Sequence, residues 1–152
     1  MNKTACALTG HRVLPANFNE QKLSEELENL IKDGCYYFYC GMAEGFDLCA
    51  LKILVSFKKT YPIKIEACVP YKGQENYFSA QMKTLYRELI LQCDETTVFF
   101  DRYTDGSFLI RNRYMVDKAD IVFSYCTRNT GGTAYTLRYA ESKGKKVIHA
   151  LL

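Results

Sequence analysis

Short apolar runs alternate with helix-like segments along the whole chain, and this alternation most restricts what the chain can fold into. Runs of β-branched, aromatic and small apolar residues predict strands at 4–10, 35–41, 63–70, 95–100, 120–126 and 145–152. The intervening segments show helical periodicity and predict helices at 19–34, 46–62, 76–93, 106–119 and 130–144. Strands that alternate with helices are typical of βαβ units. We therefore expect an α/β fold with a doubly wound, mostly parallel sheet and helices on both faces.

The length of 152 residues and a hydrophobic content of 48% suit one domain with one core, so we expect a single domain over 1–152. The run Leu48–Phe57 is apolar on nearly every side of its helix. It is expected to be a central helix or to lie in a homodimer interface.

Three predicted strands end in turns that contain glycine, at 8–12, 40–47 and 126–133. In an open parallel sheet such turns meet at one edge, where ligands bind at the switch point of the strand order. Glycine lets backbone N–H groups approach an anion, and a helix N-terminus adds positive charge. We therefore expect a phosphate cradle at Gly131, Gly132 and Thr133, at the start of a helix.

Composition excludes several other classes of site. There is no G-x-G-x-x-G fingerprint and no P-loop lysine motif, so an ordinary dinucleotide site or P-loop hydrolase is not expected. Seven cysteines lack Cys-x-x-Cys spacing and only two histidines are present, so we expect reduced thiols, no metal and no cofactor. A net charge of +3 makes nucleic acid an unlikely partner. Because no secretory leader or membrane span is evident, a cytoplasmic location is expected.

Five motifs in order resemble a known family: "TGHR", "GMAEGFD", "VPYKGQE", "RNRYMVDKAD" and "GGTAYTLRYA". They are similar to the YpsA-like branch of the SLOG superfamily. That superfamily also includes LOG-type nucleoside-monophosphate phosphoribohydrolases and the Rossmann-like domain of the DNA-processing protein DprA. The resemblance covers nearly the whole chain. It implies a Rossmann-like fold that binds nucleotides or nucleotide-derived ligands, without implying a defined reaction.

LOG enzymes carry a G-G-x-G-T-x-x-E motif whose glutamate serves hydrolysis of the N-glycosidic bond. Spacing counted from Gly131 places Arg138 at the glutamate position, whereas alignment of Gly132-Thr133 with the motif's Gly-Thr places Thr136 there. Neither is a carboxylate, so LOG-type catalysis lacks its usual group. Glu44 and Asp47 are the candidate substitutes.

The remaining candidate ligand-binding residues follow the first, second and fourth predicted strands. Arg12 suits a phosphate and His11 a base or ribose, while Glu44 suits ribose hydroxyls. Asp47 also suits a helix start, because a carboxylate is stabilised there. Lys72 and Gln74 are expected to be solvated. The full set expected to bind ligand is Gly10, His11, Arg12, Gly41, Glu44, Gly45, Asp47, Arg111, Asn112, Gly131, Gly132 and Thr133.

Three functions remain open on these observations. The first is a sensor or regulatory module that binds a nucleotide or an ADP-ribose-like molecule. The second is a nucleoside-monophosphate N-glycosidase. The third, from the DprA resemblance, is binding of single-stranded DNA, for which the basic clusters in the sequence are small.

Overall fold

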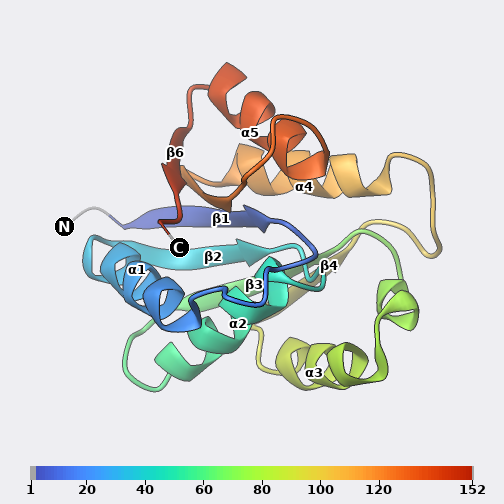
Figure 1. Ribbon diagram of the computed structural model, residues 1–152, viewed down its shortest axis with the longest axis horizontal. Coiled ribbons are helices and arrows are strands. Elements are labelled where there is room, and N and C mark those ends of the chain that lie inside the picture. The colour runs from blue at the N-terminus through green and yellow to red at the C-terminus, as the bar shows by residue number, and fades with distance from the viewer. Residues whose placement is uncertain (1–2, 152) are drawn as a thin grey trace.

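The computed structural model describes residues 3–151, which form one six-stranded sheet with helices on both faces (Figure 1). The strand order is β4-β3-β2-β1-β5-β6, and every neighbouring pair is parallel. The predicted α/β doubly wound architecture is confirmed, with a sheet that is entirely parallel. In chain order the elements are β1 (Thr4–Gly10), α1 (Glu20–Lys32), β2 (Cys35–Cys40), α2 (Phe46–Phe57), β3 (Lys64–Val69), η1 (Gln74–Tyr77), α3 (Ala80–Ile90), β4 (Glu95–Val98), α4 (Ser107–Lys118), β5 (Ile121–Tyr125), α5 (Gly132–Ser142) and β6 (Lys146–His149).

The two faces of the sheet carry different helices. Figure 1 shows α1, α2 and α3 on one face and α4 and α5 on the other. The larger core lies under the first three helices and includes Leu27, Phe38 and Leu54. A smaller core under α4 and α5 includes Met115 and Val122. Parallel strands covered on both faces are buried, which explains their nearly continuous apolar character.

Helix α2 lies between α1 and α3 and buries most of its surface within this chain. Its apolar run is therefore explained by a central position, and the homodimer stays a prediction. The longest described helix, α1, has 13 residues, so nothing in residues 3–151 has the length and apolar character of a membrane-spanning helix.

The helix expected at 76–93 is divided in the structure. A short 3-10 turn ends at Tyr77, and Phe78 is extended, with φ −80° and ψ 161°. Ser79 then caps α3, because its side chain accepts a hydrogen bond from the Met82 N–H at 3.3 Å. The local capping signal of Ser79 outweighs the apolar periodicity that runs across it.

Candidate functional site

The strand order reverses at β1, because β2 lies on one side of it and β5 on the other. The loops that follow these strands meet at the carboxyl edge of the sheet, as we predicted from their glycine-containing turns. They surround a cavity of about 290 Å³, which we call the first cavity. Nine of the predicted site residues line it: Gly10, His11, Arg12, Asp47, Arg111, Asn112, Gly131, Gly132 and Thr133.

One end of the first cavity is formed by the N-terminus of α5. Gly131 is the N-cap residue at φ +98°, a conformation that favours glycine, and no side chain caps this helix. The first N–H groups of a helix have no intrahelical acceptor, so they are available to an anion. A Cβ atom at Gly132 would meet nothing within 4 Å, so the space in front of the helix is open.

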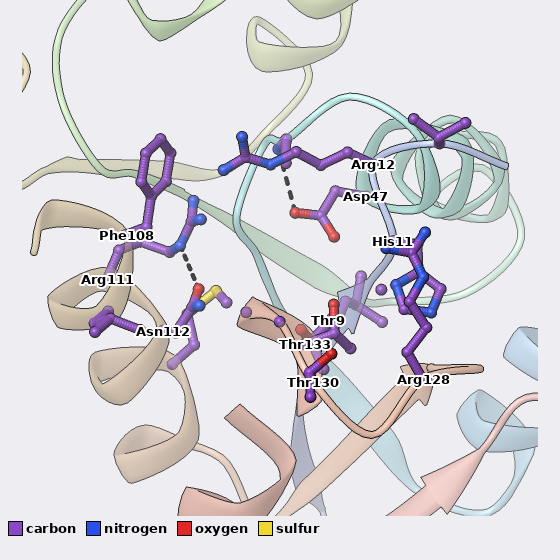
Figure 2. Close-up of a pocket in the computed structure, with 18 residues that line it drawn as sticks. Thr9, His11, Arg12, Asp47, Phe108, Arg111, Asn112, Arg128, Thr130 and Thr133 are labelled. Carbon is purple, nitrogen blue, oxygen red and sulfur yellow. Dashed lines mark hydrogen bonds between the residues drawn. The ribbon is translucent and has the colours of Figure 1, made fainter. Parts of the chain in front are cut away.

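Two exposed arginines border the same cavity. Arg12 follows β1 and Arg128 follows β5. Neither guanidinium makes an ion pair or hydrogen bond with another residue in the described range 3–151, although Arg12 stacks on the Phe108 ring at 4.5 Å. Figure 2 shows Arg128 beside His11 on one side of the cavity, and Arg111 and Asn112 on the other. The two free arginines and the α5 N-terminus together make the cavity positive.

Arg111 is buried, with 4% of its surface exposed. Its Nη1 donates to the carbonyl of Gly41 and, at 3.2 Å, to that of Cys68, while its Nε donates to Asn112 Oδ1 at 2.7 Å. Asn112 Nδ2 in turn donates to Thr136 Oγ1 at 3.0 Å. Both residues line the cavity as predicted, but Arg111 Nε and Nη1 and both side-chain polar atoms of Asn112 are bonded to the protein. Arg111 thus supports the loop after β2 and the carboxyl end of β3, and lines the cavity.

Asp47 is the carboxylate in the cavity wall and is buried, with 6% exposed. Its Oδ2 accepts a hydrogen bond from the Ala43 N–H at 3.2 Å (Figure 2). Burial raises the pKa of Asp47 to about 6, and the charge of Arg111 and the Ala43 bond offset part of this rise. A carboxyl group with this pKa can hold or release a proton near neutral pH. Asp47 is therefore both a residue of the first turn of α2 and a carboxyl group in the cavity wall.

His11 joins two of the loops. Its Nε2 accepts a hydrogen bond from the Thr127 N–H at 2.8 Å, and its ring contacts Tyr125 edge-on with centroids 5.6 Å apart. Burial, with the nearby Arg128 charge, lowers the pKa of His11. Because Nε2 is already bonded, Nδ1 is the atom that can meet a ligand.

Three predicted residues lie outside the first cavity. A Cβ at Gly45 would come within 2.2 Å of the Arg12 carbonyl, so this glycine permits two loops to touch. At Gly41 a Cβ would lie 2.8 Å from Arg111 Nη1, so this glycine makes room for the buried guanidinium. Glu44 lines a neighbouring cavity of about 390 Å³, which we call the second cavity. The two glycines act through loop packing, and their binding role stays a prediction.

Sequence reasoning missed several residues of the site. Phe108, Arg128 and Thr130 line the first cavity. Arg128 and Thr130 belong to the glycine turn after β5 and could have been found there, whereas no pattern marked Phe108. The expectation that Gln74 is solvated is wrong, because 3% of it is exposed and its Nε2 donates to the Met42 carbonyl at 3.2 Å.

Neither candidate for the LOG glutamate position brings a carboxylate to the cavity. Thr136 is buried, and its Oγ1 donates to the Gly132 carbonyl at 2.9 Å. Arg138 is exposed, and its Nη1 donates to the Asn129 carbonyl at 3.1 Å. Of the two proposed substitutes, Asp47 lines the first cavity and Glu44 the second.

Comparison with known families agrees with these motifs. The YpsA family model, described as the YspA SLOG family, matches residues 16–150. The chain belongs to this SLOG family. A UPF0398 protein of Bacillus pumilus is 24% identical over 125 residues, which cover 80% of this chain and 67% of that protein. An uncharacterized SPbeta prophage-derived protein, YoqJ of Bacillus subtilis, is 29% identical over 136 residues, covering 80% of each.

Solved structures of DNA processing protein A (DprA) share the fold of this SLOG chain. The Streptococcus pneumoniae protein matches with a TM-score of 0.71 and 16% identity, over 97% of this chain and 50% of that one. The Helicobacter pylori protein matches with a TM-score of 0.71 and 19% identity, over 96% of this chain and 64% of that one. The chain therefore spans between half and two thirds of these neighbours. At these identities the likeness shows the fold alone.

The Helicobacter pylori structure is described for its single-stranded DNA binding mode. The prediction from net charge that nucleic acid is an unlikely partner is wrong, because a protein with this fold binds single-stranded DNA. Net charge averages over the whole surface, whereas nucleic acid responds to local clusters of basic and aromatic groups.

Proposed function

We propose that this SLOG chain binds a nucleotide or nucleotide-derived ligand, such as an ADP-ribose-like molecule, as a sensor or regulatory module. We also propose that residues 1–152 form a single domain, which is supported by the single sheet. The phosphate would lie at the N-terminus of α5, held by backbone N–H groups and neutralised by Arg12 and Arg128. The observation that carries the proposal is the cavity that unites an uncapped helix N-terminus with these two free arginines.

Thermal unfolding with AMP, GMP, ADP-ribose and inorganic phosphate tests the proposal. A ligand that binds the folded state stabilises it, by about 2.7 kcal/mol when present at a hundred times its Kd. Gly132→Asp would place a carboxylate at the α5 N-terminus, where a Cβ meets nothing within 4 Å. We expect this variant to lose the stabilisation by phosphate-bearing ligands, while the neutral, equally sized Gly132→Asn retains most of it. Equal responses of the two variants would contradict the phosphate position.

A second candidate function is the binding of single-stranded DNA. It is favoured by exposed aromatic side chains beside an arginine: Tyr77 is 80% exposed, Tyr103 is 55% exposed, and both line the second cavity with Arg12. Such an arrangement suits stacked bases and a phosphate backbone. Fluorescence anisotropy with a labelled oligothymidylate should show binding that weakens steeply as salt rises. Binding that is insensitive to salt, or unchanged in Tyr103→Ala, would exclude this candidate.

The N-glycosidase alternative takes its carboxylate from Glu44 or Asp47, and the Asp47 pKa of about 6 suits acid–base chemistry. Incubation with nucleoside monophosphates would release free base if this function holds. No release by the wild-type chain would remove it.

A further inference from the structure

The second cavity has mainly aromatic walls. Its lining includes the aromatic side chains of Tyr71, Tyr77, Phe78, Tyr103 and Phe108. Glu44, which is half-buried, is the one residue with a carboxylate in this lining. Tyr71 is 7% exposed, and its ring meets those of Tyr103 and Phe108 edge-on, with centroids 5.4 and 5.8 Å away. The buried Tyr71 thus fixes one wall, while the exposed Tyr77 and Tyr103 rings stand at the opening. Walls of this kind fit a flat, aromatic ligand group.

The second cavity adjoins the first. Arg12, Ala43 and Phe108 line both. Two guanidinium groups lie near the Phe108 ring, with Arg12 at 4.5 Å and Arg111 at 5.7 Å from its centroid. One ligand can therefore place an anionic group in the first cavity and an aromatic group in the second, passing beside Arg12. Because the two cavities share these lining residues, we treat the second cavity as part of the same site.

The carboxylate of Glu44 specifies which aromatic group fits. An ionised carboxylate only accepts hydrogen bonds, and it can accept two in parallel. No ion pair or hydrogen bond engages the Glu44 carboxylate within the described range 3–151, so it is available. Among the common bases, guanine alone presents two adjacent N–H donors on one edge, at N1 and the 2-amino group. Adenine and cytosine place a ring acceptor beside their amino group, and that acceptor would face a carboxylate oxygen.

We propose that the second cavity is a base subsite selective for guanine, with Glu44 accepting from the N1–H and 2-amino N–H groups. The base stacks among Tyr71, Tyr103 and Phe108. This proposal rests on the proposed function for the phosphate end of the ligand. It selects the guanine nucleotide class for the base and disfavours adenine-bearing ligands such as ADP-ribose itself.

Isothermal titration calorimetry with GMP, AMP, guanosine and ribose 5-phosphate tests the proposal. We expect GMP to bind at least about tenfold more tightly than AMP, since a bidentate pair discriminates bases by this order. In Glu44→Gln, which keeps the size of the side chain and removes its charge, the GMP affinity should fall to about that of AMP. Thermal unfolding of the variant without ligand confirms that it is folded. Equal wild-type affinities for GMP and AMP, or an unchanged preference in Glu44→Gln, would overturn the assignment.

Guanosine and ribose 5-phosphate separate this proposal from the one it rests on. Guanosine carries the base without phosphate, and ribose 5-phosphate carries the phosphate without base. Binding of ribose 5-phosphate with no binding of guanosine, and no advantage of GMP over AMP, overturns the base subsite and leaves the phosphate site standing. Binding of guanosine, lost in Glu44→Gln, with no binding of ribose 5-phosphate supports the subsite and removes the phosphate site.

Discussion

The imidazole of His11 accepts a hydrogen bond at Nε2 from the backbone N–H of Thr127, across 2.8 Å. His11 follows β1 and Thr127 follows β5, which are neighbouring strands at the point where the strand order reverses. This bond ties together the two loops that carry Arg12 and Arg128. It exists only while Nε2 is unprotonated, because a protonated ring nitrogen cannot accept.

The first prediction concerns the protonation of His11. Burial and the Arg128 charge lower its pKa, so we expect the proton to sit on Nδ1 and titration to occur below 6.5. The folded pKa is depressed, so the stability that this bond contributes is present above about pH 6.5 and is lost as pH falls through the folded pKa. A ¹⁵N NMR titration of the ring, assigned with His11→Ala, shows which ring nitrogen carries the proton and gives the pKa of His11. A protonated Nε2 at neutral pH would contradict the prediction.

The second prediction concerns Asp47. Its folded pKa of about 6 exceeds the ordinary 3.8, so the folded state binds this proton more tightly than the unfolded chain does. Relative to Asp47→Asn, the wild type should lose stability as pH rises from about 4 to 7, by up to about 3 kcal/mol. Urea unfolding of both proteins across this range gives the difference. Parallel pH profiles would show that the Asp47 pKa is not raised in the folded chain.

The third prediction compares two glycines that both have a positive φ but differ in ψ, which is −124° at Gly45 and −1° at Gly106. Gly45 has φ +83° and Gly106 has φ +81°, but a Cβ at Gly45 would strike the Arg12 carbonyl whereas one at Gly106 meets nothing within 4 Å. Gly106→Ala should therefore cost only the backbone term of about 1–2 kcal/mol. Gly45→Ala should cost about 1–3 kcal/mol more, because it adds overpacking against the Arg12 carbonyl and its φ/ψ pair lies outside the left-handed region that alanine can enter. Denaturant midpoints measure both, and equal losses would mean that the loops separate without penalty.

The fourth prediction compares two arginines on α4. Arg111 is buried and bonded to the carbonyls of Gly41 and Cys68, whereas Arg113 is exposed and contacts Tyr135 and Tyr139. Arg111→Met leaves these carbonyls without their donor and removes the positive charge near the buried Asp47, so we expect a loss of about 3–5 kcal/mol. Arg113→Met should cost no more than about 1 kcal/mol. Chemical unfolding measures the loss in free energy of unfolding for both variants. A loss for Arg111→Met no larger than that for Arg113→Met would refute the supporting role of Arg111.

The position of the site could be predicted from the sequence, because it follows from local signals. Glycine turns such as Gly10 and Gly131 come directly after apolar runs, and parallel strands bring those turns to one edge. The same reasoning gave the basic residue Arg12, which lines the cavity. The resemblance to the family motifs predicted Arg111 and Asn112, and both residues line the cavity.

The roles of individual residues could not be predicted in the same way. Arg111 and Gln74 are polar in sequence but buried in the fold, and they donate to backbone carbonyls that are distant in sequence, at Cys68 and Met42. Phe108 carries no local signal, yet it stands between the two cavities. The roles of these residues depend on which side chains and loops come into contact at the edge of the sheet. The hydrophobic periodicity of the sequence does not predict those contacts.

The sequence by itself determined the order of strands and helices, the parallel class of the sheet and the edge at which the glycine turns surround a cavity, because periodicity and turn chemistry act over a few neighbouring residues. Only the tertiary structure decided that Asp47 is buried beside Arg111, that His11 holds Thr127, and that Glu44 belongs to a second cavity. Burial and charge proximity between loops from separate strands set these properties, and they exist only once the chain has packed.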